Sequence, residues 1–179
     1  MKLFEEKRIE DVFNEREKNI DVFLKNIGEN NIDFIVEQTK KSLEIDTKLE
    51  IDIEKRGIDH KMVKSPSGID QVRIDYTFPI KGNNELLKYT PRKNTLRRLN
   101  VNFNPGKLVI CIQTDYEEYP LDSEYENLVS NAIKQDMDYI MEQLTQIKLE
   151  CEEFNKKLPE KIRERVENKR LQFIDEQKH

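Results

Sequence analysis

The residues that could do chemistry begin with an acidic row between positions 46 and 54. Asp46-Thr47-Lys48 has the D-x-K form, and Glu50 and Asp52 follow at alternate positions. A metal-dependent nuclease needs an acidic residue and a D/E-x-K pair on adjoining strands, where they hold Mg²⁺ and polarise a water molecule. The simpler interpretation is the solvated side of an edge strand. We therefore predict no metal site, and we keep a nuclease that uses Asp46, Lys48, Glu50 and Asp52 as an alternative.

A basic cluster lies between residues 88 and 98. Five cations fall within these eleven residues, and Tyr89 lies among them. Such a cluster can bind the phosphates of a nucleotide or a nucleic acid through charge-assisted hydrogen bonds. Pro91 and the lack of clean periodicity predict a loop, which is where binding residues concentrate. The alternative is a solvated loop that balances acidic surroundings. The candidate anion-binding or partner-binding residues are Lys81, Lys88, Arg92, Lys93, Arg97 and Arg98.

The sequence lacks the common catalytic and nucleotide-binding motifs. The patterns GxSxG, HExxH, GxxxxGK[ST] and GxGxxG do not occur in it. It has two histidines, and His60 lies between Asp59 and Lys61 in a polar stretch that is typical of an exposed loop. We therefore predict no catalytic residues and no cofactor. The question of enzymatic activity stays open, with a lean towards none.

The two cysteines, Cys111 and Cys151, have no CxxC or Cys/His partner nearby. That spacing argues against a structural zinc site, and two unpaired thiols fit a reducing cytosol. The N-terminal stretch MKLFEEKRIEDVF is charged and lacks the apolar segment of a signal peptide. No apolar run approaches the 18 residues of a membrane span. We predict a cytoplasmic protein with no membrane partner.

Length and composition limit the fold and the partners. The chain has 179 residues, 37% of them charged and 36% hydrophobic, and a net charge of -5. This length suggests one domain, or one compact domain with a long helical extension. The apolar content is low, but its periodicity is too regular for a disordered chain. The excess of acidic residues disfavours a strongly basic nucleic-acid binder and leaves room for a local basic patch.

Two periodicities divide the first part of the chain into helices and strands. Apolar residues at steps of three or four predict amphipathic helices over 5–27 and 32–43, separated by Gly28. Strict alternation then predicts strands over 49–54 and 72–80, each with one buried face. Helices therefore come first, and a region of half-buried strands follows.

Turn residues mark two points between the predicted strands. A short strand over 60–63 is predicted to end at the turn of residues 65–68, which reads Ser-Pro-Ser-Gly. A second hairpin near 98–114 turns at Pro105-Gly106, since proline and glycine suit the two central positions of a type II turn. The unbroken apolar run over 108–112 predicts a central strand that is covered on both faces.

A long helix follows residue 122. Ser123 and Glu126 have the capping-box spacing, and apolar residues then alternate steps of four and three over nearly four heptads, as in a coiled coil. Pro159 predicts a kink or the start of a new helix. The partner of this apolar seam is the 5–27 helix, the stretch after Pro159 or another copy of the chain, so an internal bundle and a dimer both stay open. The seam residues are Ile133, Met137, Ile140, Leu144, Ile147 and Phe154, with Cys151 and Leu158 at the same spacing.

The order of elements indicates the fold class. Helices, then four or five short antiparallel strands, then a long helix favour an α+β fold over a parallel βαβ fold. The predicted α+β core spans residues 1–122, with helices within 5–43 and a sheet within 48–114. The segment 123–179 is predicted to be a coiled-coil-like helical extension, kinked near Pro159.

Several weak motifs point to a known kind of module. The stretch VRIDYTFPIKGNNELLKYTP, from Val72 to Pro91, joins a strand to a G-x-x-x-L-[LF]-x-Y-x-P turn. The pattern continues in the hairpin of 99–113, in the F-N-x-x-L-P sequence of 154–159 and in Asn-Lys-Arg of 168–170. Over residues 45–172 the chain resembles an accessory module that precedes a nuclease or Toll/interleukin-receptor-like effector in bacterial defence-type proteins. The effector implied by this resemblance is missing here, so the chain is either a fragment of a longer protein or a stand-alone version.

Three functions follow from these observations. The leading hypothesis is a non-enzymatic regulatory, sensing or assembly module, placed in antiviral defence by the resemblance, with a protein partner or a second copy of the chain. The second hypothesis is a small metal-dependent nuclease that uses the acidic row. The third is a phosphate-binding or nucleic-acid-binding domain that uses the basic cluster, whose binding would depend strongly on salt.

Overall fold

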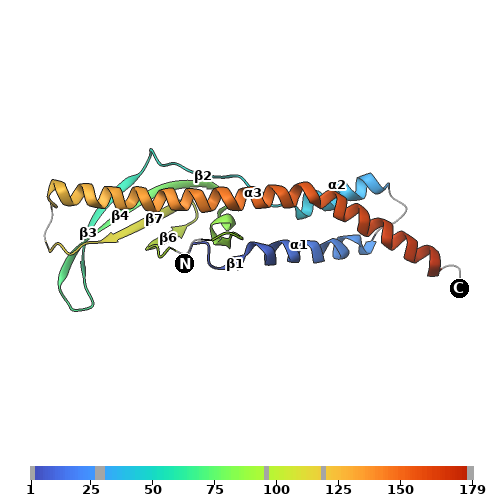
Figure 1. Cartoon of the computed structure of the whole chain (residues 1–179), viewed down its shortest axis with the longest axis horizontal. Coiled ribbons are helices and arrows are strands. Elements are labelled where there is room, and N and C mark those ends of the chain that lie inside the picture. Colours follow the sequence, from blue (N-terminus) through green and yellow to red (C-terminus); the bar gives the residue numbers. More distant parts are fainter. Residues whose placement is uncertain (1–2, 27–30, 95–96, 118–119, 177–179) are drawn as a thin grey trace.

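The computed structural model describes residues 3–26, 31–94, 97–117 and 120–176. They form an elongated α+β structure along one long helix, α3, which confirms the predicted fold class (Figure 1). The helices are α1 (Ile9–Phe23), α2 (Ile32–Leu43) and α3 (Ser123–Glu176), with short 3-10 helices η1 (Leu24–Asn26) and η2 (Asn84–Lys88). The strands are β1 (Lys7–Arg8), β2 (Leu49–Ile51), β3 (Gly57–Lys64), β4 (Asp70–Gly82), β5 (Tyr89–Thr90), β6 (Val101–Asn104) and β7 (Lys107–Gln113).

The main sheet is antiparallel and is built around β4. Strands β2 and β3 pair in succession along one side of β4, at residues 80–82 and 70–77, and β7 pairs along its other side. Strand β6 then pairs with β7 through the predicted turn, in which Gly106 has a φ of 83°. The predicted hairpin near 98–114 and the predicted turn at 65–68 are therefore confirmed. His60 lies in β3, so the prediction of a loop histidine is wrong. The predicted short strand at 60–63 is confirmed, and the observed strand is longer than predicted.

One face of the sheet packs against α3. Alternate residues of β4, from Val72 to Ile80, are buried, as are Leu108 and Ile110 of β7. They share one hydrophobic cluster with α3. Strand β7 lies between β4 and β6, so its predicted central position is confirmed. On the face of β7 away from α3, the side chains of Arg73 and Asn102 contact the sulfur of Cys111.

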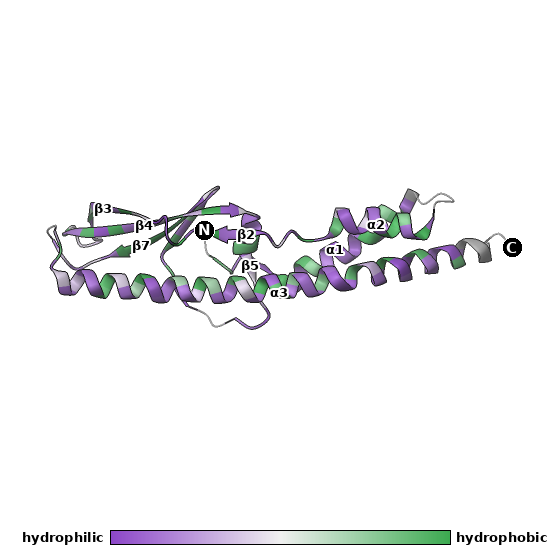
Figure 2. Cartoon of the chain, turned by 90° about the horizontal axis from the view of Figure 1, so that it is seen from above, coloured by the Kyte–Doolittle hydropathy of each residue, from purple (hydrophilic) through white to green (hydrophobic). Residues whose placement is uncertain are grey.

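The seam of α3 lies in the chain's own core. Each of its six residues is at most 6% exposed. The sheet packs along the first half of α3, and α1 and α2 lie along the second half (Figure 2). The partner of the seam is thus mostly a sheet, where the sequence predicted another helix. A twisted sheet, like a coiled partner helix, follows a stripe that turns slowly around α3.

Three predicted boundaries are corrected by the structure. The first helix begins at Ile9 because the two preceding residues form β1, which pairs in parallel with β5. Strand β2 ends at Ile51, and Asp52 instead closes a turn by accepting a hydrogen bond of 3.1 Å from the Lys55 backbone N–H. The cap of α3 is Asp122, whose carboxylate accepts from the Tyr125 N–H at 2.8 Å, in place of the predicted capping box at Ser123.

Helix α3 continues through Pro159 and bends in its C-terminal part (Figure 1). Proline has no N–H to donate to the carbonyl four residues earlier, and its ring crowds that carbonyl. The predicted kink is thus present within one helix. Because α3 supplies core residues to both halves of the molecule, the proposed division of the chain at residue 122 stays a prediction.

Candidate functional site

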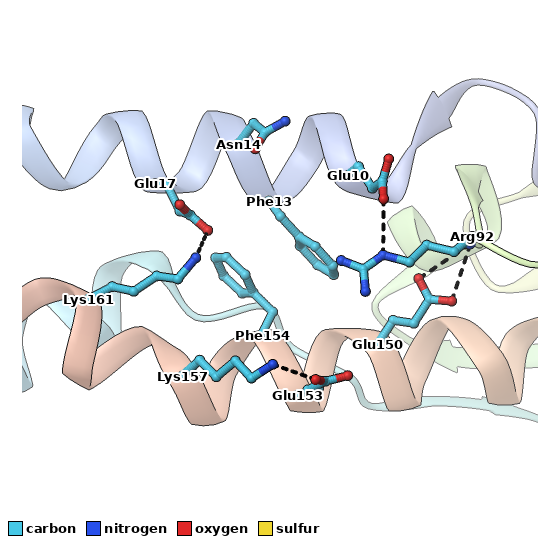
Figure 3. A pocket seen from close by; sticks show the side chains of 10 residues that line it. All are labelled: Glu10, Phe13, Asn14, Glu17, Arg92, Glu150, Glu153, Phe154, Lys157 and Lys161. Carbon is cyan, nitrogen blue, oxygen red and sulfur yellow. Dashed lines mark hydrogen bonds and ion pairs between the residues drawn. The ribbon is translucent and has the colours of Figure 1, made fainter.

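A cleft of about 450 Å³ lies between α1, α3 and the segment that follows β5 (Figure 3). Its walls come from segments about 60 to 150 positions apart in the sequence, so only the folded chain brings them together. Helix α1 contributes Glu10, Phe13 and Glu17 on one side. Arg92 closes one end, and α3 forms the opposite wall.

The base of the cleft is aromatic. The rings of Phe13 and Phe154 stack with centroids 4.6 Å apart and an interplanar angle of 7°. The guanidinium carbon of Arg92 lies 5.9 Å from the centroid of Phe13, within the range of a cation–π interaction. The apolar base therefore holds α1 against α3 and lies beside a cation.

Three cations line the cleft, and each has a carboxylate partner (Figure 3). The Arg92 Nε lies 3.2 Å from Glu10, and the Lys157 ammonium lies 2.6 Å from Glu153. Lys161 pairs with Glu17. The hydrogen bond and charge of Lys157 hold the pKa of Glu153 below its usual value. Two of the three pairs join α1 to another part of the chain.

A buried carboxylate positions the end of the cleft. Glu150 of α3 accepts two hydrogen bonds from the backbone N–H of Arg92, at 3.2 and 3.4 Å, and a third from Gln146 at 2.9 Å. Glu150 is buried, and such a carboxylate needs these donors. It therefore fixes the backbone from which the Arg92 side chain enters the cleft.

The structure separates the residues of the predicted basic cluster. Arg92 lies in the cleft, whereas Arg97 is 2.6 Å from Asp136 of α3 and Lys88 is 2.7 Å from Glu85. Burial raises the pKa of Asp136, and Arg97 opposes that rise. The remaining cations have exposed side chains, and they are Lys81, Lys93 and Arg98.

The acidic row does not gather around one point. Asp46 accepts a hydrogen bond from the backbone N–H of Lys48, and Asp52 pairs with Lys55 at 3.4 Å. Glu50 lies opposite Lys81 in the sheet register. Among the described residues, no group of three or more His, Cys, Asp or Glu side chains could hold a metal ion.

Sequence reasoning identified one cleft cation, Arg92, and missed Lys157 and Lys161. A weak signal was present: the two lysines are four residues apart, so they lie on the same side of α3. The approach of α1 to that side depends on tertiary packing, which the spacing does not reveal.

A second polar cluster lies on the face of the sheet away from α3. Asp75, whose side chain is 7% exposed, accepts hydrogen bonds from Arg73 at 2.6 and 3.2 Å and from Lys61 at 3.1 Å. Burial alone would raise the pKa of Asp75, but the bonds from Arg73 and Lys61 outweigh it and lower the pKa. The cluster neutralises a buried charge, so its geometry is that of a structural site.

Comparison with protein-family models, with curated proteins and with solved structures finds no match to the chain. The resemblance to a defence-type accessory module therefore stays a prediction. None of the helices in the described part of the chain is long and apolar enough to cross a membrane.

Proposed function

We propose that the chain is a non-enzymatic sensing module that binds a phosphate-bearing small molecule in the cleft between α1 and α3. The observation that supports this proposal is the convergence of Arg92, Lys157 and Lys161 on one cleft with an aromatic base (Figure 3). Arginine and lysine side chains bind phosphate oxygens through charge-assisted hydrogen bonds. Phe13 and Phe154 lie next to these cations and give the ligand's carbon skeleton an apolar surface.

The ion pairs of the cleft suggest how binding is sensed. Glu10 and Glu17 both belong to α1, and they pair with Arg92 and Lys161, which belong to other segments. A phosphate carries more negative charge than a carboxylate, so it competes for these two cations. Binding would weaken two of the links that hold α1 in place. The position of α1 is the proposed output of the sensor.

Calorimetric titration at low salt, with pyrophosphate and ATP as probes, tests this function. We expect Arg92→Ala and Lys161→Ala each to weaken binding by about 10- to 100-fold, the range of one charge-assisted hydrogen bond. Arg98→Ala is the matched control, because Arg98 is exposed and does not line the cleft. Losses in Arg92→Ala and Arg98→Ala with unchanged binding in Lys161→Ala would move the site to the 88–98 loop. The absence of any heat of binding in the wild type would reject the proposal.

Two broader parts of the prediction remain proposals. A reducing, cytosolic location is supported by Cys111 and Cys151, both of which are buried free thiols. A place in antiviral defence is supported by the sequence resemblance.

A further inference from the structure

Strand β3 forms a long edge of the sheet. In the described part of the chain it pairs with β4 on one side and with no strand on the other. It has eight residues and no proline, and its one glycine is its first residue. Edge strands present backbone N–H and C=O groups that can pair with another chain. Figure 2 shows β3 on the side of the sheet away from α3.

The two faces of β3 carry different side chains. Ile58 and Met62 lie on the same face as the buried residues of β4 but remain 49% and 52% exposed. Asp59 and Lys61 lie on the other face, with side chains 62% and 53% exposed. The strand therefore offers a half-covered apolar pair on one face. On the other face it offers two opposite charges, which in the single chain pair with each other at 3.1 Å.

These four residues are arranged symmetrically about His60. The sequence Ile58-Asp59-His60-Lys61-Met62 places one apolar residue and one charge on each side of the histidine. In antiparallel pairing of two copies with His60 opposite His60, Ile58 faces Met62 and Asp59 faces Lys61, each twice. A two-fold axis perpendicular to the sheet keeps each pair on one face, and such cross-strand pairs are favourable.

Neighbouring registers lack this complementarity. A shift that brings Asp59 opposite Asp59 places like charges face to face, and a shift that brings Lys61 opposite Lys61 does the same. The intermediate shifts turn the apolar residues of one copy to the charged face of the other. Among these registers, the one centred on His60 matches both the apolar pair and the charged pair.

We propose that two copies of the chain form a two-fold dimer by antiparallel pairing of β3 with β3, in the register centred on His60. The two sheets then form one continuous sheet, and both edge strands become paired. Ile58 and Met62 of the two copies cover one another, which accounts for their exposure in the single chain. This dimer does not depend on the ligand proposed for the cleft.

Charge exchange tests the pairing. In sedimentation equilibrium we expect the wild type at twice the chain mass of 21.5 kDa. Asp59→Lys alone and Lys61→Glu alone place like charges opposite each other twice and should sediment as monomers. An equal mixture of the two variants restores opposite charges at every pair and should dimerise. Glu37→Lys, an exposed position on α2, is the control for the change of charge and should leave the dimer intact.

Cysteine cross-linking tests the register without altering Lys61, which also binds Asp75. Under mild oxidation, Ile58→Cys and Met62→Cys should form an intermolecular disulfide when mixed, and neither should do so alone. A wild type that is monomeric at high concentration would overturn the proposal. So would dimers that persist in both charge variants, or cross-linking of either cysteine variant with itself.

Discussion

Asp75 is the residue whose surroundings most clearly control its charge. It lies almost buried on the sheet face away from α3, between Arg73 and Lys61. An ionised carboxylate in such a place is tolerated because several charge-assisted hydrogen bonds replace water. The two donors come from adjacent strands, so the carboxylate also links β3 to β4. The alternation of β4 predicted the face on which Asp75 lies but not its burial.

Asp75→Asn should lower the free energy of unfolding by about 2 kcal/mol at pH 7, since it removes hydrogen bonds to a charged group. The lowered pKa of Asp75 fixes the pH dependence. Its contribution is present above the ordinary Asp pKa of about 4 and is lost as the pH falls through the lower, folded-state pKa. Urea unfolding from pH 7 to pH 2 should therefore show the two proteins converging in acid. Asp138→Asn, at an exposed position of α3, serves as the control. A gap that stays constant at pH 2 would contradict this account.

The two thiols should react slowly in the native protein. Burial raises the pKa of Cys151 to about 12, and burial followed by the hydrogen bond with Asp75 raises the pKa of Cys111. The reactive species is the thiolate, which is scarce at pH 8 when the pKa is raised. An aromatic disulfide reagent should label both cysteines rapidly in denaturant and neither on the same timescale in native buffer. Rapid native labelling of one cysteine would show that its surroundings open.

Among the elements, the link between α2 and β2 is held by one side chain of α3. The Asn155 amide accepts a hydrogen bond from the Ile45 backbone N–H at 2.8 Å and donates one to its carbonyl at 2.7 Å. The side-chain amide thus makes the two hydrogen bonds that a neighbouring strand would make with the backbone of Ile45. Asn155 follows the seam residue Phe154 in the sequence. The spacing of residues along a helix does not show which loop crosses it, so this link could not be predicted.

Asn155→Ala should lower the free energy of unfolding by about 1–3 kcal/mol, because both backbone groups of Ile45 lose their partner. Asn155→Asp should be at least as damaging, since a carboxylate then faces the Ile45 carbonyl. Thermal and urea unfolding would measure both changes. Asn168→Ala, an exposed asparagine on the same helix, should have little effect. Similar losses at both asparagines would mean that helix propensity, and not this link, is being measured.

Two glycines, one at the end of β4 and one in the turn between β6 and β7, should differ in their tolerance of a side chain. Gly82 and Gly106 both have positive φ, at 111° and 83°. A Cβ on Gly106 meets open space, whereas one on Gly82 would lie 2.1 Å from the Lys48 carbonyl oxygen. Gly106→Ala should therefore cost about 1–2 kcal/mol of backbone strain. Gly82→Ala should add about 1–3 kcal/mol of overpacking to that strain. Denaturant unfolding should therefore show Gly82→Ala to be clearly less stable than Gly106→Ala.

The elements differ in how well the sequence predicted them. The second helix and the 98–114 hairpin were predictable because strong local signals, such as the Pro105-Gly106 turn, agree with tertiary packing. The first helix was predicted too long because pairing of β1 with β5 straightens the chain before Ile9. Within the site, Arg92 belonged to a visible cluster, but its approach to Phe13 depends on contacts across the fold.

At the scale of the whole molecule, α3 runs along two halves of one hydrophobic core that differ in kind. Its 54 residues span about 80 Å at 1.5 Å per residue, and its first half packs on the sheet while its second half packs on α1 and α2. Ion pairs such as Arg163–Asp33 and Arg165–Asp21 add to the helical half. The proposed ligand cleft lies in the helical half and the proposed dimer edge in the sheet half. One continuous helix thus connects the two surfaces.

The burial of the α3 seam leads to a prediction about the whole fold. Leu144 is 1% exposed and lies where α3 packs within the chain, so Leu144→Asp places an unpaired carboxylate in the core. The cost is several kcal/mol, comparable with the roughly 5–15 kcal/mol that stabilises a typical domain. Circular dichroism should show loss of cooperative folding. Leu149→Asp, at a position of the same helix that is 56% exposed, is the control and should fold as the wild type does. If the seam were instead an interface between copies, Leu144→Asp would give a folded monomer. The β3 charge variants, in contrast, should give folded monomers, because they alter the edge of the sheet and leave the hydrophobic core intact.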